Sequence, residues 1–179
     1  MNPSVPRLPA SSESSRLKAV RPRDRHAALG MAVSLLAADP AFQRLTFGHW
    51  SRTLIGLVRR EHFLFVVDGN AVVGFVGWAL TTADKAEQWL AGRLELSFDD
   101  CLDGEMLVIN VWKASTQASN RLLVDALRTM FRTKTAVYYK RFYPDGRVRP
   151  KRLKVNAFVE SHVRRRPSPA TAAVSPQYG

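Results

Sequence analysis

The spacing of apolar residues changes period several times along the chain, which predicts a domain that contains both helices and strands. Apolar residues recur at helical intervals over residues 27–38 and again over residues 48–58. Asp39-Pro40 ends the first helix, because the residue before a proline avoids the α region. Two β-rich runs follow, His62–Val67 and Ala71–Trp78. The Asp68-Gly69-Asn70 turn between them predicts a β-hairpin.

The second half of the chain alternates between the same two periods. Helical spacing returns over residues 82–90, with Thr81 or Thr82 as the N-cap, and over residues 117–131. The stretch between these helices, Glu105–Trp112, is a continuous apolar run. Such a run is typical of a strand in the middle of a sheet, where both faces are buried.

A second predicted hairpin closes the pattern. Ala136–Phe142 and Arg147–Phe158 alternate in polarity around Pro144-Asp145-Gly146. The resulting order, α-α-β-β-α-β-α-β-β, predicts an α+β fold, a GNAT-like mixed sheet flanked by helices. We expect strand 106–112 in the centre of this sheet and the two helices of residues 27–58 packed on it.

Length and composition predict a single domain between two disordered ends. The chain has 179 residues, of which 46% are hydrophobic, enough for one core. Residues 1–26 and 164–179 are rich in Pro, Ser and Arg, so we expect a disordered basic arm, a domain over residues 27–163 and a disordered tail. No apolar run is long enough for a transmembrane helix or a secretory signal. The single cysteine cannot form a disulfide within the chain, which fits a reducing compartment, so we expect the protein to be cytoplasmic.

The charge of the chain points to anionic partners. Lys and Arg number 27 against 15 Asp and Glu, which gives a net charge of +12. Such a field attracts nucleic acid, an anionic membrane face or an acidic carrier protein, and composition leaves all three open. For nucleic acid we expect only non-specific, salt-sensitive binding.

Most catalytic signatures are missing from the sequence. There is no phosphate-binding loop, no nucleophile elbow and no Cys-x-x-Cys pair, and no two histidines have the spacing of a helical zinc site, so we expect no metal. The thiol of Cys101 follows Asp99-Asp100, which disfavours a thiolate, so we interpret it as structural. The turn after the predicted central strand, residues 113–119, has no glycine to bring backbone amides to a pyrophosphate. We therefore expect no acetyl-CoA cofactor.

Several segments resemble the haemolysin-activating lysine-acyltransferase family. Its characteristic features are a Ser-Pro-x-His segment, a Gly/Ser-Trp-Ala strand end and an acidic/Gly turn before a strand that carries an aspartate. The corresponding segments here are Asp39-Pro40, Gly77-Trp78-Ala79 and Asp103-Gly104-Glu105. The stretch 35–82 fits without gaps, and a looser match continues to about residue 155.

The resemblance implies a protein-lysine acyltransferase on a GNAT-like fold. Members of this family acylate internal lysines of RTX toxins and use acyl carrier protein as the fatty-acyl donor, so the implied partners are acyl carrier protein and an acceptor protein with a target lysine. That donor also suits the basic charge of the chain.

Three catalytic positions of the family are altered in this chain. The family's histidine falls on Phe42, its supporting asparagine on Thr53 and its strand aspartate on Asn110. Because Phe42 cannot transfer a proton, either another group has taken over or the chain has kept the fold and lost the chemistry. We predict His49 as the relocated general base, with Thr53 or Asn110 orienting its ring and Asn110 also able to donate to an oxyanion.

The predicted second hairpin is strongly basic and aromatic. Over residues 134–154 it has eight Lys and Arg against one acid, Asp145. Such a surface suits an acidic carrier, single-stranded nucleic acid or simply solvent. Of the three we predict carrier docking. The residues expected to bind the carrier are Trp78, Arg141, Arg147, Arg149 and Arg152.

Overall fold

The fold follows the predicted order of elements, with three short additions: a strand at the start of the sheet, a one-turn helix after the first long helix and a 3₁₀ helix before the central strand. The computed structural model describes residues 17–143 and 147–155. Its elements are β1 (Lys18–Val20), α1 (Arg25–Ala37), α2 (Pro40–Gln43), α3 (Phe47–Arg60), β2 (Phe63–Asp68), β3 (Ala71–Thr81), α4 (Ala83–Leu90), the short 3₁₀ helix η1 (Asp99–Cys101), β4 (Met106–Ala114), α5 (Gln117–Met130), β5 (Ala136–Phe142) and β6 (Val148–Lys154).

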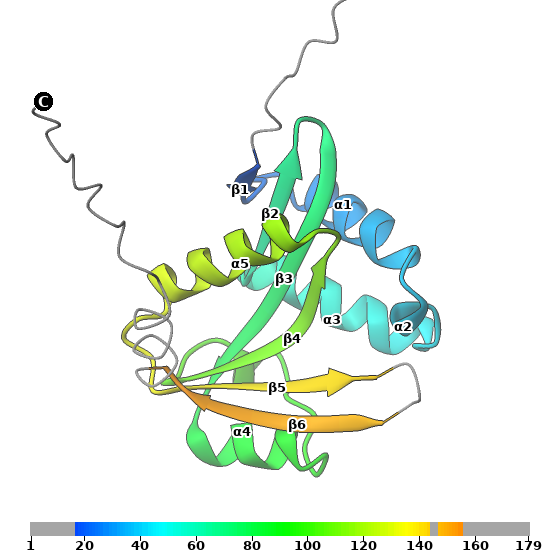
Figure 1. Ribbon diagram of the computed structural model, residues 1–179. Helices are drawn as coiled ribbons and strands as arrows, with labels where there is room; N and C mark the ends of the chain where they lie inside the picture. The colour runs from blue at the N-terminus through cyan, green and yellow to red at the C-terminus, as the bar shows by residue number, and fades with distance from the viewer. Residues whose placement is uncertain (1–16, 144–146, 156–179) are drawn as a thin grey trace, which may run out of the picture.

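The strands form one six-stranded mixed sheet in the order β1-β2-β3-β4-β5-β6 (Figure 1). Only β4 and β5 run parallel, because helix α5 connects them, and every other neighbouring pair is antiparallel. The β4 strand has β3 on one side and β5 on the other, so the predicted central position of Met106–Trp112 is confirmed. The α+β class, a mixed sheet flanked by helices in a single domain, is also confirmed.

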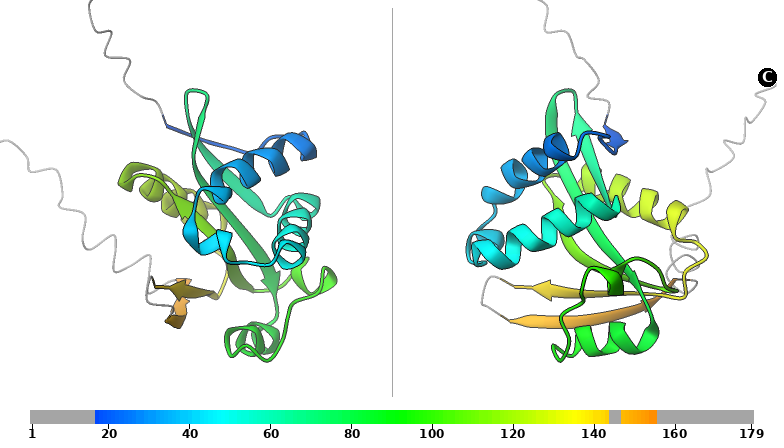
Figure 2. Two further views of the ribbon diagram at one scale, coloured as in Figure 1. Left: turned by 90° about the vertical axis from the view of Figure 1, so that its right-hand side faces the viewer. Right: turned by 180° about the vertical axis from the view of Figure 1, so that it is seen from behind.

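Helices cover both faces of the sheet (Figure 2). The α1 and α3 helices pack on one face, where their apolar side chains form a buried cluster with Phe63, Phe65 and Phe75 and with Val111 of β4. The two helices of residues 27–58 therefore pack on the sheet as predicted. Most of the sheet residues that they cover belong to β2 and β3. The α5 helix buries Leu123 and Leu127 on the opposite face. These two layers decide which side chains reach the functional site.

The close fit of α3 against the sheet depends on one glycine. A Cβ atom on Gly77 of β3 would lie 2.3 Å from Cδ1 of Leu57, far inside van der Waals contact. Leu57 is fully buried, so it has no space into which to retreat. Gly77 therefore sets the distance between α3 and the sheet, and with it the position of every site residue on α3.

Some boundaries differ from the prediction. The described domain begins by residue 17 rather than at residue 27, because Lys18–Val20 pair with β2 and Asp24 caps α1. A three-residue strand is too short to show a period, which is why the sequence does not reveal it. The predicted strand 147–158 is described only to Lys154 as β6. The predicted turn 144–146 and the tail 164–179 lie outside the described residues, and within those residues no helix is long and apolar enough to cross a membrane.

Candidate active site

The site lies where the two parallel strands of the sheet separate. The β4 and β5 strands pair over only four positions, from Met106 with Ala136 to Ile109 with Tyr139. Beyond that point they diverge, as Figure 1 shows, although β4 continues to Ala114 and β5 to Phe142. Since neither strand has a partner across the gap, backbone and side chains on both of its sides are available to a ligand.

Asn110 is placed at this fork by a β-bulge. On β3, Trp78 pairs with Ile109 and Gly77 pairs with Val111, so Asn110 is the extra residue of β4. It is also the first β4 residue beyond the parallel pairing. Its Oδ1 atom is buried and has no hydrogen-bond partner among the described residues. Bulges often aim a side chain into an active site, and a buried amide without a partner is costly unless a ligand satisfies it.

A cleft of about 1500 Å³ opens at the fork. It is lined from both layers of the molecule, because the separation of β4 and β5 leaves a gap between the helices on the two faces of the sheet. On its α5 side the apolar residues Val124, Leu127 and Phe131 lie beside the polar residues Asn120 and Arg128. Its α3 side is polar and charged, with His49, Thr53, Arg59 and Arg60. Such a cleft can hold an apolar chain against one wall and a polar reacting group near the other.

The three predicted catalytic residues all line this cleft. His49 and Thr53 lie one turn apart on α3, and Asn110 lies at the fork. The Thr53 hydroxyl, however, donates to the backbone carbonyl of His49 at 3.0 Å rather than to its ring. The described residues supply no hydrogen bond to the exposed imidazole of His49. The structure thus brings the three residues to one cleft without joining them in a hydrogen-bonded relay.

Phe42 occupies the altered histidine position of the family. It lies on α2, which begins at Pro40 and is capped by the Asp39 carboxylate. The ring is half-buried, packs against the α1–α3 side of the core and lines the cleft. The side chain at this position therefore faces the cleft, and here that side chain cannot carry a proton.

Lys140 lies on the other side of the fork from Asn110. It follows Tyr139, the last β5 residue that pairs with β4, and its ammonium group lies 4.5 Å from the centre of the Trp89 ring. Burial lowers the pKa of Lys140 below its ordinary value. A lysine in such a setting loses its proton more readily than one in water.

Arg60 ends α3 on the wall of the cleft. It is half-buried, and burial lowers the pKa of the guanidinium group. Its Nε atom is fully covered and has no hydrogen-bond partner in the described part of the chain. Its neighbour Cys101 is buried, and burial, more than the adjacent Asp100, raises the pKa of that thiol. Cys101 is therefore a neutral structural thiol, although burial rather than the acidic residues is the main cause.

The predicted carrier-binding residues fall into three groups. Arg141, Arg147 and Arg149 lie 5.0, 5.5 and 5.6 Å from the centre of one ring, that of Tyr143, and we call these three the Tyr143 cluster. All three are exposed at the end of the β5–β6 hairpin, and Arg141 also lines the cleft. Arg152 instead forms an ion pair with Glu87 of α4, which also accepts a hydrogen bond from the Tyr138 hydroxyl.

Trp78 has a different environment from the one expected of a docking residue. It is 2% exposed and packs edge-on against Phe131 at 5.2 Å, in the core beneath α5. A ring buried to this extent cannot contact the surface of a carrier protein. The carrier contact predicted for Trp78 is thus corrected to a packing role.

The turn after β4 is occupied by its own side chains. Thr116 and Ser119 form a reciprocal capping box that takes up backbone amides at the start of α5. Lys113 pairs with the Asp39 carboxylate at 2.6 Å. Fewer free amides and a nearby carboxylate make this helix start a weaker site for a pyrophosphate than an uncapped glycine-rich turn.

Comparison with known proteins identifies the family. The HlyC model, described as the RTX toxin acyltransferase family, matches residues 21–160. The chain belongs to this family. No individual curated protein matches the chain. The predicted resemblance is therefore confirmed by the family match.

Two solved structures are similar to the chain, and both are described as GNAT-like. One is the GphF GNAT-like decarboxylase in complex with isobutyryl-CoA, with 18% identity, coverage of 72% of this chain and 67% of that one, and a TM-score of 0.48. The other is the loading GNATL domain of CurA from Lyngbya majuscula, with 10% identity, coverage of 73% and 68%, and a TM-score of 0.48.

The structure gives physical reasons for two segments that resemble the RTX toxin acyltransferase family. In Gly77-Trp78-Ala79, the glycine admits Leu57 of α3, the tryptophan fills the α5 face, and the register shifts between the first two residues opposite Asn110. In Asp103-Gly104-Glu105, Gly104 has φ +146° and lies against the backbone of Thr81. In both segments the glycine therefore permits the close approach of a neighbouring side chain or strand.

Sequence reasoning missed Arg60, Lys140 and Phe98 as cleft residues. The Arg59-Arg60 pair at a predicted helix end was the available signal, but cations at helix C-termini are common because they offset the helix dipole. Lys140 was one of many basic residues in its segment. The fork distinguishes Lys140 from its neighbours, and the packing of Phe98 against the end of α3 distinguishes Arg60; both depend on contacts between distant parts of the chain.

Proposed function

We propose that the chain transfers a fatty acyl group from acyl carrier protein to a lysine of a partner protein. The observation that carries the proposal is the cleft at the β4–β5 fork in a member of the RTX toxin acyltransferase family. The apolar residues Val124, Leu127 and Phe131 of the α5 wall suit a fatty acyl chain, since each buried methylene is worth about 0.8 kcal/mol. The polar α3 wall suits the amine and the thioester.

The chemistry requires a neutral amine. The lysine ammonium first gives a proton to a base, and its nitrogen then attacks the thioester carbonyl. A C–N bond forms, the C–S bond breaks, and the sulfur leaves as the carrier's thiol after taking up a proton. We assign the base to His49, because a histidine titrates near neutral pH and Phe42 cannot serve. The Nδ2 group of Asn110, at the bulge beside the fork, would donate to the developing oxyanion.

The surface and the turn after β4 both favour a protein-bound donor. The exposed guanidinium groups of the Tyr143 cluster would attract an acidic carrier and speed its encounter with the cleft. The capped start of α5 offers little to the pyrophosphate of a nucleotide cofactor. We therefore propose no separate cofactor besides the acylated carrier.

Intact-mass measurement of the acceptor tests this function. The protein would be incubated with acyl carrier protein loaded with a fatty acyl group and with a candidate acceptor, and peptide mapping would locate the added acyl mass on a lysine. We expect Phe42→His, which restores the family's residue, to keep or raise the rate. Absence of any acyl adduct with every acyl length tried, despite binding of the acceptor, would refute catalysis.

The second candidate function is binding without catalysis. The specific observation that favours it is Phe42 facing the cleft at the family's histidine position. On this reading the chain would hold an acceptor or a carrier through the same cleft and leave it unmodified. The mass experiment separates the two functions, because only the enzyme adds mass to its partner.

A further inference from the structure

Arg60 is a half-buried cation without a charged partner among the described residues. Its Nε atom is fully covered, and among the described residues it has no hydrogen-bond partner and takes part in no ion pair. The helix dipole at the end of α3 offsets only a fraction of a unit charge. Since a buried charge is costly unless it is paired, this arrangement calls for an anion.

The position of Arg60 is built by its neighbours rather than left to chance. A Cβ atom at Gly56, one turn earlier on α3, would lie 3.0 Å from Nη1 of Arg60, so the glycine leaves room for the guanidinium group beside the helix. The Phe98 ring lies 5.1 Å from Cζ of Arg60 and 4.7 Å from Cζ of Arg59. The Phe98 ring thus packs beside the group, and the missing Cβ of Gly56 leaves space for it in the cleft wall.

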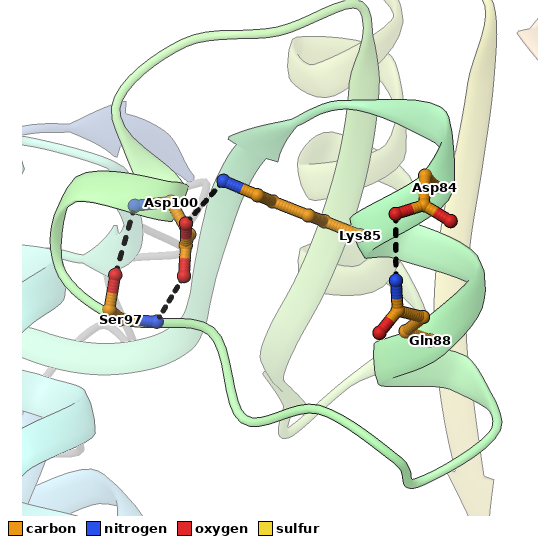
Figure 3. A network of polar contacts seen from close by, with 5 residues as sticks. All are labelled: Asp84, Lys85, Gln88, Ser97 and Asp100. Carbon is orange, nitrogen blue, oxygen red and sulfur yellow. Dashed lines mark hydrogen bonds and ion pairs between the residues drawn. The ribbon is translucent and has the colours of Figure 1, made fainter.

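The loop that carries Phe98 is itself fixed by polar contacts (Figure 3). Asp100 accepts a hydrogen bond from the backbone amide of Ser97 at 2.9 Å, and its own amide donates to the Ser97 hydroxyl at 3.2 Å. Lys85 of α4 pairs with the same carboxylate. These contacts tie the loop to α4, so the ring against Arg60 belongs to an ordered frame.

The lining of the cleft has an excess of positive charge. Its basic residues are Arg52, Arg59, Arg60, Arg128, Lys140 and Arg141. Its carboxylates are Asp39 and Glu95, and Lys113 already neutralises Asp39. The field inside the cleft therefore attracts an anion toward the wall on which Arg60 lies.

We infer that Arg60 is the anion-binding residue of the cleft and pairs with an oxyanion, a phosphate or a carboxylate, of the molecule that enters it. The planar guanidinium group matches both of these groups through paired N–H donors. Two sources supply such an oxyanion: the phosphodiester of the carrier's pantetheine arm and a carboxylate beside the acceptor lysine. Only the choice between these sources rests on the proposed function.

Inorganic phosphate is the first probe, because it needs no catalytic activity. The melting temperature of the full chain would be followed as phosphate replaces chloride at constant ionic strength. We expect a saturable rise for the unmodified protein and at least tenfold weaker phosphate affinity for Arg60→Gln. The matched control is Arg121→Gln, which removes the same charge from an exposed position of α5 that does not line the cleft. Equal phosphate responses in Arg60→Gln and the unmodified protein overturn the inference.

Gly56→Ala tests the geometry without changing the charge. The new Cβ atom would crowd the Arg60 guanidinium group, so phosphate affinity should fall, whereas alanine favours the helix and should not lower the melting temperature. A protein that keeps full phosphate affinity with this substitution contradicts the role assigned to the space beside Gly56, and with it the built site.

Acyl-transfer kinetics then identify the source of the oxyanion. If the oxyanion belongs to the donor, Arg60→Gln should raise KM for the acylated carrier. If the oxyanion belongs to the acceptor, the same substitution should raise KM for the acceptor. In either case kcat should be less affected. Transfer with neither KM changed overturns the inference and leaves the proposed function intact. A phosphate response that depends on Arg60 in a protein without any transfer activity supports the anion site and refutes only the enzyme.

Discussion

Replacement of Gly104 by alanine should destabilise the protein severely, because two costs fall on one residue. Gly104 has φ +146°, a backbone conformation that alanine adopts only with strain of about 1–3 kcal/mol. Its Cβ atom would also lie 2.1 Å from the carbonyl oxygen of Thr81, where ordinary contact begins at 3.4 Å. The atom in the way belongs to the backbone of β3, so no side-chain rotation relieves the clash.

The second cost, the clash between the new Cβ atom and the Thr81 carbonyl, is comparable to the cost of overpacking a core. Thr81 pairs with Met106 at the start of β4, and the Gly104 carbonyl accepts a hydrogen bond from Lys134 at 2.7 Å. Moving the strand end away strains both contacts, at about 1–3 kcal/mol. Together the two costs give about 4 kcal/mol, a large share of a typical unfolding free energy of about 5–15 kcal/mol.

Gly92→Ala is the matched control for this prediction. Gly92 also has positive φ, +73°, but an added Cβ atom would meet nothing within 4 Å. Only the conformational strain remains, about 1–2 kcal/mol. Urea unfolding of both variants, with the midpoint and the slope fitted together, gives the two losses. If the losses agree within about 1 kcal/mol, the contact with Thr81 has no energetic weight and the reasoning fails.

Three further predictions concern charge and protonation. His49→Ala should lower the acyl-transfer rate by about a hundredfold or more, while His26→Ala, at the exposed start of α1, should not, and an unchanged rate would remove His49 from the mechanism. Reversal of the Tyr143 cluster to glutamate should weaken carrier binding at low salt, and a binding constant independent of both charge and salt would disprove electrostatic docking. His62 has its pKa lowered to about 4, chiefly by burial, so it is neutral in the folded protein and takes up a proton on unfolding between about pH 6.5 and 4. The free energy of unfolding should therefore fall as the pH drops through this window, and His62→Gln should make this fall smaller. Urea unfolding of both proteins at several pH values measures the effect, and the same change of unfolding free energy with pH in both proteins would contradict the prediction.

The sequence by itself determined the local elements and the family. The Asp68-Gly69-Asn70 turn between two β-rich runs defined the β2–β3 hairpin, and the apolar run from Met106 defined a strand buried on both faces. Both signals are local, because turn conformation and side-chain period depend on neighbouring residues. Of the segments that resemble the family, Gly77-Trp78-Ala79 lies within β3, Asp39-Pro40 lies at the start of α2, and Asp103-Gly104-Glu105 directly precedes β4. Each is a short stretch of consecutive residues, so it could be recognised before any strand was paired.

The tertiary structure alone decided which residues meet at the site. Asn110 is a bulge only because Trp78 and Gly77 pair with its two neighbours, and the fork exists only because β4 and β5 stop pairing after Ile109. Trp78 looked like a candidate for surface contact until the sheet and α5 closed over it. Arg60 looked like an ordinary helix end until its Nε atom was found covered and unbonded in the cleft wall. Strand register and burial depend on contacts between residues that are far apart in the chain. The spacing of apolar residues along the sequence does not show which distant residues pair.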